Sequence, residues 1–256
     1  MSLQISSLNA GYGRQQILHD VSIDDMKSGE MVGVIGPNAA GKSTFFKSLT
    51  GIVRPRSGYV SLDDQDILSM RRKQRARQVA YMPQSIGCNA ALTVFESVLL
   101  ALKQTTGWRV GTDHLNKVSN TLSMLGLCHL ADKGIGALSG GQSQMVAVAQ
   151  VLVRKPKLLL LDEPTSALDL HHQLSILSAI RDASKEFDII VMAALHDLNL
   201  AAKFCDRLVL IREGRVLADG EPREILGLEA LNETYRIRAS IEKSSLGTYY
   251  VDAQLP

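Results

Sequence analysis

The sequence has few cysteines and no long apolar run. Cys88, Cys128 and Cys205 lie far apart, without a CxxC pair or a histidine at metal-ligand spacing. This pattern argues against a disulfide scaffold and predicts free thiols in a reducing compartment. Apolar runs such as Leu158–Leu161 and Ile189–Leu195 are far shorter than the ~18 residues that a membrane span needs. The sequence therefore argues against secreted, fibrous and integral membrane proteins.

Targeting signals and a charge bias are also missing. The first ten residues lack the basic start and the apolar core of a signal peptide. Basic and acidic residues number 28 and 26, so no global field attracts nucleic acid or anionic lipid. No repeat or linker divides the 256 residues, and a composition of 45% hydrophobic and 21% charged residues is typical of soluble globular proteins.

The apolar pattern predicts an α/β fold with a helical insertion. Leu3, Ile5 and Leu8 nearly alternate with polar residues, as in a strand with one buried face. Strands that alternate with helices favour a mainly parallel sheet. The expected strands are 31–35, 79–82, 157–161, 188–194, 207–211 and 216–218, and the expected helices include 42–50 and 170–185.

Residues 86–155 are expected to be rich in helix. Thr93-Val-Phe-Glu96 has the capping-box pattern, in which a threonine and a glutamate three residues later satisfy the first N–H groups of a helix. Further along, leucine and valine recur at spacings of three and four, which predicts one apolar helix face. That face consists of Leu115, Val118, Leu122 and Leu125.

Residues 36–43, called the phosphate loop below, read Gly-Pro-Asn-Ala-Ala-Gly-Lys-Ser. They fit the pattern GxxxxGK[ST] between an expected strand and an expected helix, where small residues let backbone N–H groups face phosphate oxygens. We expect Lys42 to contact the β- and γ-phosphates and Ser43 to ligate Mg²⁺. A simple turn before a helix is the alternative. The predicted ATP-binding residues here are Gly36, Pro37, Asn38, Ala39, Ala40, Gly41, Lys42, Ser43 and Thr44.

Two carboxylates, Asp162 and Glu163, follow a run of leucines at the end of an expected strand. Mg²⁺ beside a phosphate loop needs such an acidic partner. We expect Asp162 to hold Mg²⁺ through water and Glu163 to polarise the attacking water. The alternative is an acidic corner that Pro164 terminates.

Leu138-Ser-Gly-Gly-Gln142, called the signature loop below, places a second glycine-rich loop before a helix. With this motif the chain resembles the ATPases of the ATP-binding cassette (ABC) family over nearly its whole length, whereas other P-loop enzymes lack it. The resemblance implies a head-to-tail homodimer, because each half-site alone leaves the γ-phosphate open to water. ATP on the phosphate loop of one subunit is then covered by Ser139, Gly140, Gly141 and Gln142 of the other.

The resemblance also implies roles for residues outside these loops. Tyr12, within Gly-Tyr-Gly, matches the aromatic residue that stacks on adenine, and a hairpin tyrosine is the alternative. Gln84 matches the glutamine that contacts Mg²⁺ and links to the membrane subunit, and His196 matches the histidine that touches the γ-phosphate. A histidine at a strand end is otherwise most often a core residue. The implied catalytic residues are Glu163, His196 and Gln84; the metal ligands are Ser43, Gln84 and Asp162; and the loop that crosses the dimer is Ser166, Ala167, Leu168 and Asp169.

Two departures from the family pattern and one basic cluster stand out. Ala39 replaces the usual glycine, which costs about 1 kcal/mol if φ is positive there and weakens ATP binding modestly. Ser143 stands where a basic residue is frequent, and nothing follows from it. The cluster Arg71–Arg77 fits a solvated helix face better than a nucleic-acid site, since no aromatic residues are interleaved for base stacking.

The expected architecture is one ABC-type P-loop NTPase domain over 1–256, with a mainly parallel sheet, an antiparallel β portion and a helical subdomain. The nucleotide-binding core spans about 1–85 and 156–220, the helical subdomain about 86–155, and a C-terminal appendage about 221–256. These bounds follow the motif order in the sequence.

Three stretches resemble the ATPase subunits of bacterial importers for ferric siderophores, haem and cobalamin. They are Leu168–Gln173, Leu195–Ala202 and Asp219–Leu226. The resemblance implies an ATP- and Mg²⁺-dependent subunit at the cytoplasmic face of the bacterial inner membrane. Its partners are a second copy, a membrane permease and, indirectly, a substrate-binding protein, with no nucleic acid. The alternatives are an exporter subunit and a soluble ABC ATPase that acts on nucleic acid or ribosomes.

Overall fold

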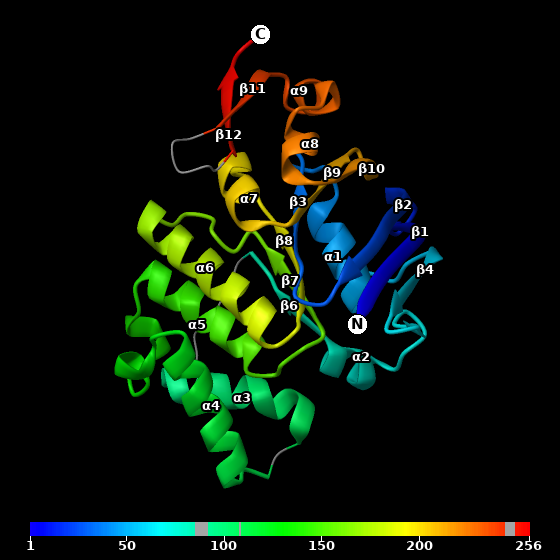
Figure 1. Ribbon diagram of the computed structural model, residues 1–256. Helices are drawn as coiled ribbons and strands as arrows, with labels where there is room; N and C mark the ends of the chain where they lie inside the picture. The colour runs from blue at the N-terminus through cyan, green and yellow to red at the C-terminus, as the bar shows by residue number, and fades with distance from the viewer. Residues whose placement is uncertain (85–91, 108, 244–248) are drawn as a thin grey trace.

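The computed structural model describes residues 1–84, 92–107, 109–243 and 249–256, so Cys88 lies outside the described residues. Its strands are β1 (Ser2–Tyr12), β2 (Gln15–Lys27), β3 (Met31–Ile35), β4 (Ser57–Leu62), β5 (Gln65–Asp66), β6 (Val79–Met82), β7 (Leu158–Asp162), β8 (Ile190–Ala194), β9 (Arg207–Arg212), β10 (Arg215–Gly220), β11 (Arg238–Lys243) and β12 (Tyr249–Gln254). Its helices are α1 (Lys42–Thr50), α2 (Arg72–Gln78), α3 (Val94–Thr106), α4 (Thr112–Met124), α5 (Gly140–Leu152), α6 (Leu170–Glu186), α7 (Leu198–Phe204), α8 (Pro222–Leu226) and α9 (Glu229–Tyr235), with short 3₁₀ turns η1 (Cys128–Leu130) and η2 (Ile135–Ala137). Figure 1 shows their arrangement.

A six-stranded sheet lies at the centre, in the order β10-β9-β3-β8-β7-β6. Strands β9, β3, β8, β7 and β6 are parallel, and β10 is an antiparallel edge strand. Every residue of β3, β7 and β8 is buried, which explains why these strands are continuous apolar runs rather than alternating ones. The carboxyl ends of the parallel strands meet at one edge of the sheet, where α/β proteins place their ligands.

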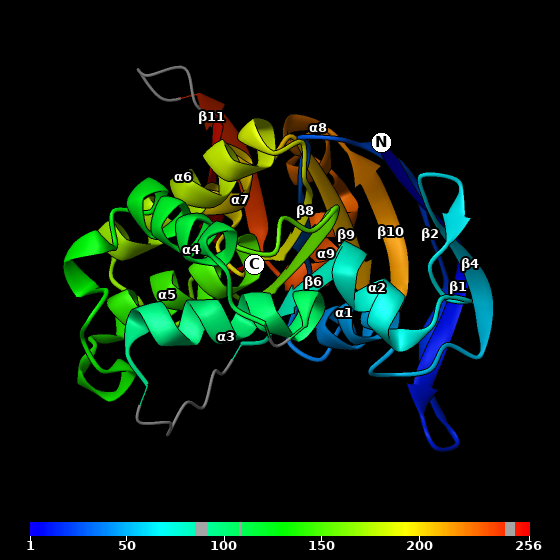
Figure 2. The same cartoon turned by 90° about the horizontal axis from the view of Figure 1, so that it is seen from below.

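Different layers cover the two faces of this sheet. Val32 and Val34 of β3 belong to a core shared with α1 and with β1, β2 and β4, while Met31 and Ile35 belong to a core shared with α5, α6 and α7. Figure 2 shows helices α3–α6 on one side of the central strands and β1, β2 and β4 on the other. Successive side chains of a strand point to opposite faces of the sheet, so each strand packs against both layers.

A smaller antiparallel sheet has the order β2-β1-β4-β5 and confirms the expected antiparallel portion. Leu3, Ile5 and Leu8 are all buried. Their imperfect alternation arises from a shift in register between Ile5 and Leu8, where Ser7 has φ 49°. A β-bulge thus keeps all three side chains on the core face.

The described part of the predicted helical region contains α3, α4, η1, η2 and α5. The capping box forms as predicted: the Glu96 N–H donates to Thr93 Oγ1 at 3.2 Å, and the Thr93 N–H donates to Glu96 Oε2 at 2.8 Å. On α4, Val118 and Leu122 are buried, but Leu115 is 39% exposed. The predicted apolar face is therefore correct at Val118, Leu122 and Leu125 and wrong at Leu115, which lies in the first turn of the helix.

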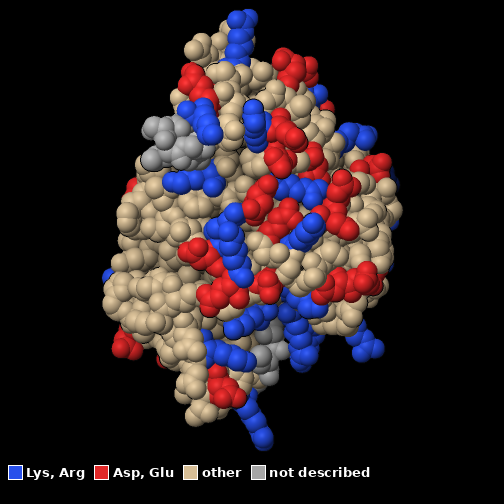
Figure 3. All heavy atoms as spheres, viewed as in Figure 1, with Lys and Arg blue, Asp and Glu red and all other residues tan. Residues whose placement is uncertain are grey.

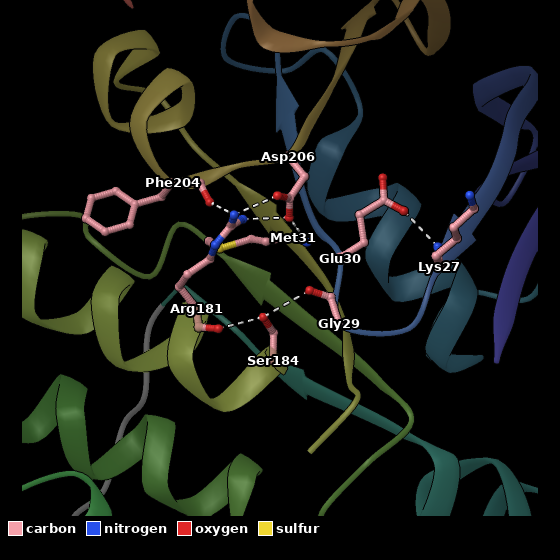
Figure 4. Close-up of polar contacts among 8 residues, drawn as sticks. All are labelled: Lys27, Gly29, Glu30, Met31, Arg181, Ser184, Phe204 and Asp206. Carbon is pink, nitrogen blue, oxygen red and sulfur yellow. Dashed lines mark hydrogen bonds and ion pairs between the residues drawn. The ribbon is translucent and has the colours of Figure 1, made fainter. Parts of the chain in front are cut away.

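Helix α6 is fastened to the sheet by an ion pair at its solvent edge. Figure 4 shows Arg181 donating to both carboxylate oxygens of Asp206 at 2.5 and 2.6 Å. Asp206 also accepts the Met31 N–H at 2.9 Å, and Arg181 donates to the Phe204 carbonyl at 2.8 Å. This bidentate pair joins α6, the end of α7 and the first residue of β3.

The chain beyond residue 221 folds into α8, α9 and the hairpin β11–β12. Asn199 of α7 clasps this hairpin, because it accepts the Val251 N–H at 2.7 Å and donates to the Val251 carbonyl at 3.4 Å. Figure 1 shows α8, α9 and the hairpin beside α7 and β9.

Two surface expectations can be compared with the structure. Helix α2 has no buried residue and leads into β6, which confirms the solvated basic helix. On the face in Figure 3, acidic and basic side chains are interspersed. Among the helices of the described residues, none has the length and apolar character that a membrane crossing requires.

The cysteines inside the described ranges are both free thiols, as predicted. Cys128 is exposed, whereas Cys205 is buried and its burial raises the thiol pKa to about 12.

Candidate active site

The phosphate loop connects β3 to α1 and has an unusual backbone. Gly36 has φ 149°, Gly41 has φ 106° and Ala39 has φ 62°. A Cβ atom at Gly36 would lie 2.1 Å from the Ile211 carbonyl oxygen, so only glycine fits there. Ala39 meets the condition stated above for strain, because a side chain at positive φ costs about 1 kcal/mol.

Lys42, the first residue of α1, lies inside the loop and is only 5% exposed. Its Nζ donates to the carbonyl oxygens of Gly36 at 2.6 Å and Pro37 at 3.0 Å. Burial lowers the pKa of Lys42 below its usual value, while the nearby carboxylates Glu163 and Asp162 oppose that shift. The ammonium group is thus held inside the loop, beside two carboxylates.

Ser43 and Asp162 meet directly, although they come from α1 and β7. The Ser43 hydroxyl donates to Asp162 Oδ1 at 2.9 Å, and Asp162 is 3% exposed. The Tyr81 hydroxyl donates to Asp162 Oδ2 at 3.0 Å. Burial and the Asp162 charge raise the pKa of Tyr81. A hydroxyl beside a carboxylate is an oxygen donor set of the kind that Mg²⁺ prefers.

Glu163 directly follows β7, and its carboxylate contacts two side chains. Gln84 Nε2 donates to Glu163 Oε2 at 2.5 Å, and His196 Nε2 lies 2.5 Å from Glu163 Oε1. Gln84 follows β6 and His196 follows β8, so three neighbouring parallel strands bring the three side chains together. Glu163 itself has φ 54°, a strained backbone of the kind found at functional sites.

A cavity of about 260 Å³ opens at the phosphate loop. Its lining combines residues of the loop and the start of α1 with Glu163 and Ile17. Sequence reasoning missed Ile17 and Tyr81. Tyr81 stands three residues before Gln84 in the motif Tyr-Met-Pro-Gln, and this closeness was its sequence signal. No local motif indicates Ile17. Tyr12, at the end of β1, is 51% exposed and does not line this cavity.

The signature loop caps α5. Ser139 Oγ accepts the Gln142 N–H at 3.3 Å, and Gln142 Oε1 accepts the Ser139 N–H at 3.2 Å. Gly141 is covered by the ring of His172, whose Cδ2 would lie 2.1 Å from a Cβ atom there. None of residues 139–142 is among the described residues that line the phosphate-loop cavity. Within one chain, the two glycine-rich loops do not form one pocket.

The segment predicted to cross the dimer leads from Glu163 to α6. Ala167 has φ 60°, and the Ser166 N–H donates to the Glu163 carbonyl oxygen at 3.2 Å. Asp169 caps α6 by accepting the His172 N–H at 2.9 Å. That backbone bond, followed by the bond from the His172 side chain, lowers the pKa of Asp169. Ala167 and Asp169 are exposed.

Comparison with known proteins agrees with this geometry. The family model described as ABC transporter matches residues 18–166. The hemin import ATP-binding protein HmuV of Bradyrhizobium diazoefficiens is 37% identical over 257 residues, which cover 97% of this chain and 93% of that protein. The iron(3+)-hydroxamate import ATP-binding protein FhuC of Bacillus subtilis is 36% identical over 242 residues, which cover 94% and 90%.

A solved structure has the same fold. It is described as an inward-facing conformation of a putative metal-chelate type ABC transporter. The TM-score is 0.83 and the sequence identity is 26%. The likeness covers 99% of this chain and 96% of that one, including the segment after residue 221. The fold, the phosphate-loop geometry and the sequence relatives lead to one conclusion: this chain belongs to the ATP-binding ATPases of the ABC transporter family.

Proposed function

We propose that this chain is the ATP-hydrolysing subunit of an ABC importer for an iron-siderophore, haem or cobalamin-type substrate. It works as a homodimer on a separate membrane permease at the cytoplasmic face of the bacterial inner membrane, and a substrate-binding protein delivers the cargo. The importer assignment rests on relatives named for hemin and iron(3+)-hydroxamate import, which align over nearly the whole chain.

The hydrolytic function rests on one observation above the others. Gln84, Glu163 and His196 converge at the carboxyl ends of three parallel strands, beside a cavity that Lys42 and the phosphate loop line. A carboxylate in that place has the position of a general base. Backbone N–H groups at the start of α1 have the position of phosphate-binding donors.

The residues then divide the work of phosphoryl transfer. Lys42 donates to the phosphate oxygens and offsets charge that develops in the transition state. Ser43 and Asp162, with Gln84, are the residues that would hold Mg²⁺, which neutralises phosphate charge when bound. Tyr81 fixes the orientation of Asp162 through its hydrogen bond. Glu163 accepts a proton from the attacking water, and His196 stabilises the γ-phosphate from the neighbouring strand end.

A second copy completes the site. Ser139, Gly140, Gly141 and Gln142 supply donors at the start of α5, and they are not among the described residues that line the phosphate-loop cavity of their own chain. In the proposed dimer these donors of one subunit cover the γ-phosphate that the other subunit holds, and Tyr12 stacks on adenine. The segment Ser166–Asp169 carries contacts between the two sites.

Transport in a reconstituted system tests this proposal. The full chain is purified with the permease subunits that accompany it and placed in liposomes that contain ATP on the side of the chain. ATP-dependent uptake of a ferric siderophore, haem or cobalamin supports the proposal. ATP-dependent movement in the opposite direction would assign the chain to an exporter, and ATP turnover without a permease but with RNA or ribosomes would assign it to the soluble class.

A further inference from the structure

The chain's C-terminal segment (residues 221–256) contacts the phosphate loop through a hydrogen bond. The Gly36 N–H donates to the hydroxyl oxygen of Tyr235, the last residue of α9, at 2.7 Å. These two residues are 199 positions apart in the sequence. A buried backbone N–H without a partner is costly, and here the partner is a side chain from outside the parallel-sheet layer.

Gly36 is a pivotal residue of the loop because both of its backbone groups are engaged. Its N–H donates to Tyr235, while its carbonyl accepts the Lys42 ammonium at 2.6 Å. Its φ of 149° and the proximity of the Ile211 carbonyl leave it no room for a side chain. A displacement of Gly36 therefore shifts Lys42 and the start of the loop together.

Local structure holds Tyr235 in place. Helix α9 ends at Arg236, which has φ 56°, and the Ile237 N–H closes the helix end by donating to the Asn232 carbonyl at 3.1 Å. The Asn232 side chain accepts the Ala239 N–H at 3.0 Å. Burial raises the pKa of Tyr235 to about 12. A phenol hydroxyl both donates and accepts hydrogen bonds, and here its oxygen accepts the Gly36 N–H.

The loop also borders a second cavity, on the side of α9. Its volume is about 540 Å³, and it is lined by the loop residues Pro37–Ala40, by Arg212 and Glu213, and by residues 233–236 of the C-terminal segment. Arg212 Nη1 and Glu233 Oε2 lie 3.7 Å apart across this region. The Gly36–Tyr235 hydrogen bond joins the loop to α9 beside this cavity.

A second tether keeps the C-terminal segment in place. Asn199 binds the Val251 backbone at 2.7 Å and 3.4 Å, and it lies three residues after His196. The C-terminal segment thus contacts the phosphate loop through α9 and the element that follows His196 through β12.

We propose that Tyr235 is a positioning residue for ATP binding, whose hydroxyl holds Gly36 and the phosphate loop in the shape that receives the phosphates. This inference rests on the proposed ATPase function. It makes the C-terminal segment a working part of the nucleotide site.

The test compares two tyrosine variants of the full chain. Tyr235→Phe keeps the ring and removes the acceptor of the Gly36 N–H, and we expect the Kd for ATP with Mg²⁺ to rise about tenfold, or ~1.4 kcal/mol. The turnover number of the transporter complex at saturating ATP should change by less than about twofold. Tyr250→Phe is the matched control: its hydroxyl donates to Glu242 within the hairpin β11–β12, and its loss should leave the Kd unchanged. Isothermal titration calorimetry and steady-state kinetics give these values.

A Tyr235→Phe variant that binds ATP within about twofold of wild type would overturn the inference, as would a loss confined to turnover. If wild type and Tyr250→Phe both fail to bind ATP, the proposed function itself fails instead. If Tyr235→Phe does not fold, hydrogen–deuterium exchange on the wild-type chain decides. Slow exchange at the Gly36 amide supports the hydrogen bond to Tyr235, and exchange as fast as in an exposed loop contradicts it.

Discussion

At the scale of single residues, the proposed hydrolysis depends most directly on Glu163. Its two carboxylate oxygens are engaged by Gln84 and His196, each at 2.5 Å, and its side chain is 14% exposed. Both oxygens of this carboxylate therefore have fixed partners at the edge of the phosphate-loop cavity. The backbone of Glu163 is strained as well, with φ 54°.

Glu163→Gln should leave ATP binding intact and lower hydrolysis by about 10²–10⁴-fold, the usual scale for a general base. The amide keeps the shape of the site but cannot accept the proton. Turnover of the purified transporter complex, with ATP affinity measured in parallel, checks this. Glu186→Gln, at the end of α6, is the control and should turn over normally. Hydrolysis by Glu163→Gln at a near-normal rate would remove Glu163 from the role of base.

Ala39 is the second residue at which sequence and backbone can be compared. Its φ of 62° is a conformation that glycine adopts without strain. Ala39→Gly should therefore tighten ATP binding by up to about fivefold, for ~1 kcal/mol of relieved strain. Ala40→Gly is the control, because Ala40 is not among the described residues with positive φ and no strain is relieved there. Calorimetric titration with ATP measures both, and equal or weaker binding by Ala39→Gly would show that the loop accommodates alanine.

At the scale of single elements, local sequence signals predicted helix starts and buried strands better than they predicted which strands pair. The capping box at Thr93 and the buried strands β3 and β7 follow from short patterns, because each depends on neighbours in sequence. The bulge in β1 and the hairpin β11–β12 did not follow. Arg238–Lys243 has mixed charges and no buried residue of its own. Its pairing with β12 brings Ile241 opposite Val251, whose backbone Asn199 of α7 holds.

Thr93→Ala tests the contribution of one cap to α3. The substitution removes the acceptor of the Glu96 N–H, and we expect the free energy of unfolding to fall by about 1 kcal/mol. Chemical denaturation followed by circular dichroism measures it. Thr121→Ala is the control, because the Thr121 hydroxyl donates within α4 to the Lys117 carbonyl and its loss should cost less than about 0.5 kcal/mol. Equal effects of the two substitutions would mean that the cap contributes nothing specific.

At the scale of the whole molecule, the two glycine-rich loops lie on different layers. The phosphate loop follows β3, and the signature loop starts α5 on the helical side of the central sheet. Ser139 and Gly140 are exposed. Such an arrangement suits a site that is shared between two copies of the chain.

Ser139→Arg tests the shared site. A bulky cation there should block closure, so that hydrolysis by the assembled transporter fails while ATP binding to the isolated subunit stays nearly intact. Mixing this variant with Lys42→Ala subunits places both defects in one site and leaves the other site unaltered. Partial recovery of turnover in the mixture, measured against each variant alone, is the expected result. Loss of ATP binding in a folded Ser139→Arg subunit would place Ser139 in its own subunit's pocket.

Short sequence patterns were enough to predict the two glycine-rich loops and the paired carboxylates. GxxxxGK[ST], the paired carboxylates Asp162 and Glu163, and the signature loop are local patterns, since a backbone shaped by glycine and a carboxylate at a strand tip need only neighbouring residues. The strand order then explains why Gln84 and His196 reach Glu163.

Long-range packing sets which distant side chains contact these groups. Tyr81 on Asp162, Ile17 in the cavity wall and Tyr235 on Gly36 join residues that no local pattern connects. Each contact depends on how separate layers dock, and docking is set by the burial of whole apolar faces rather than by any short motif. The physical reason is the same in each case: the energy of these contacts exists only once the layers have packed.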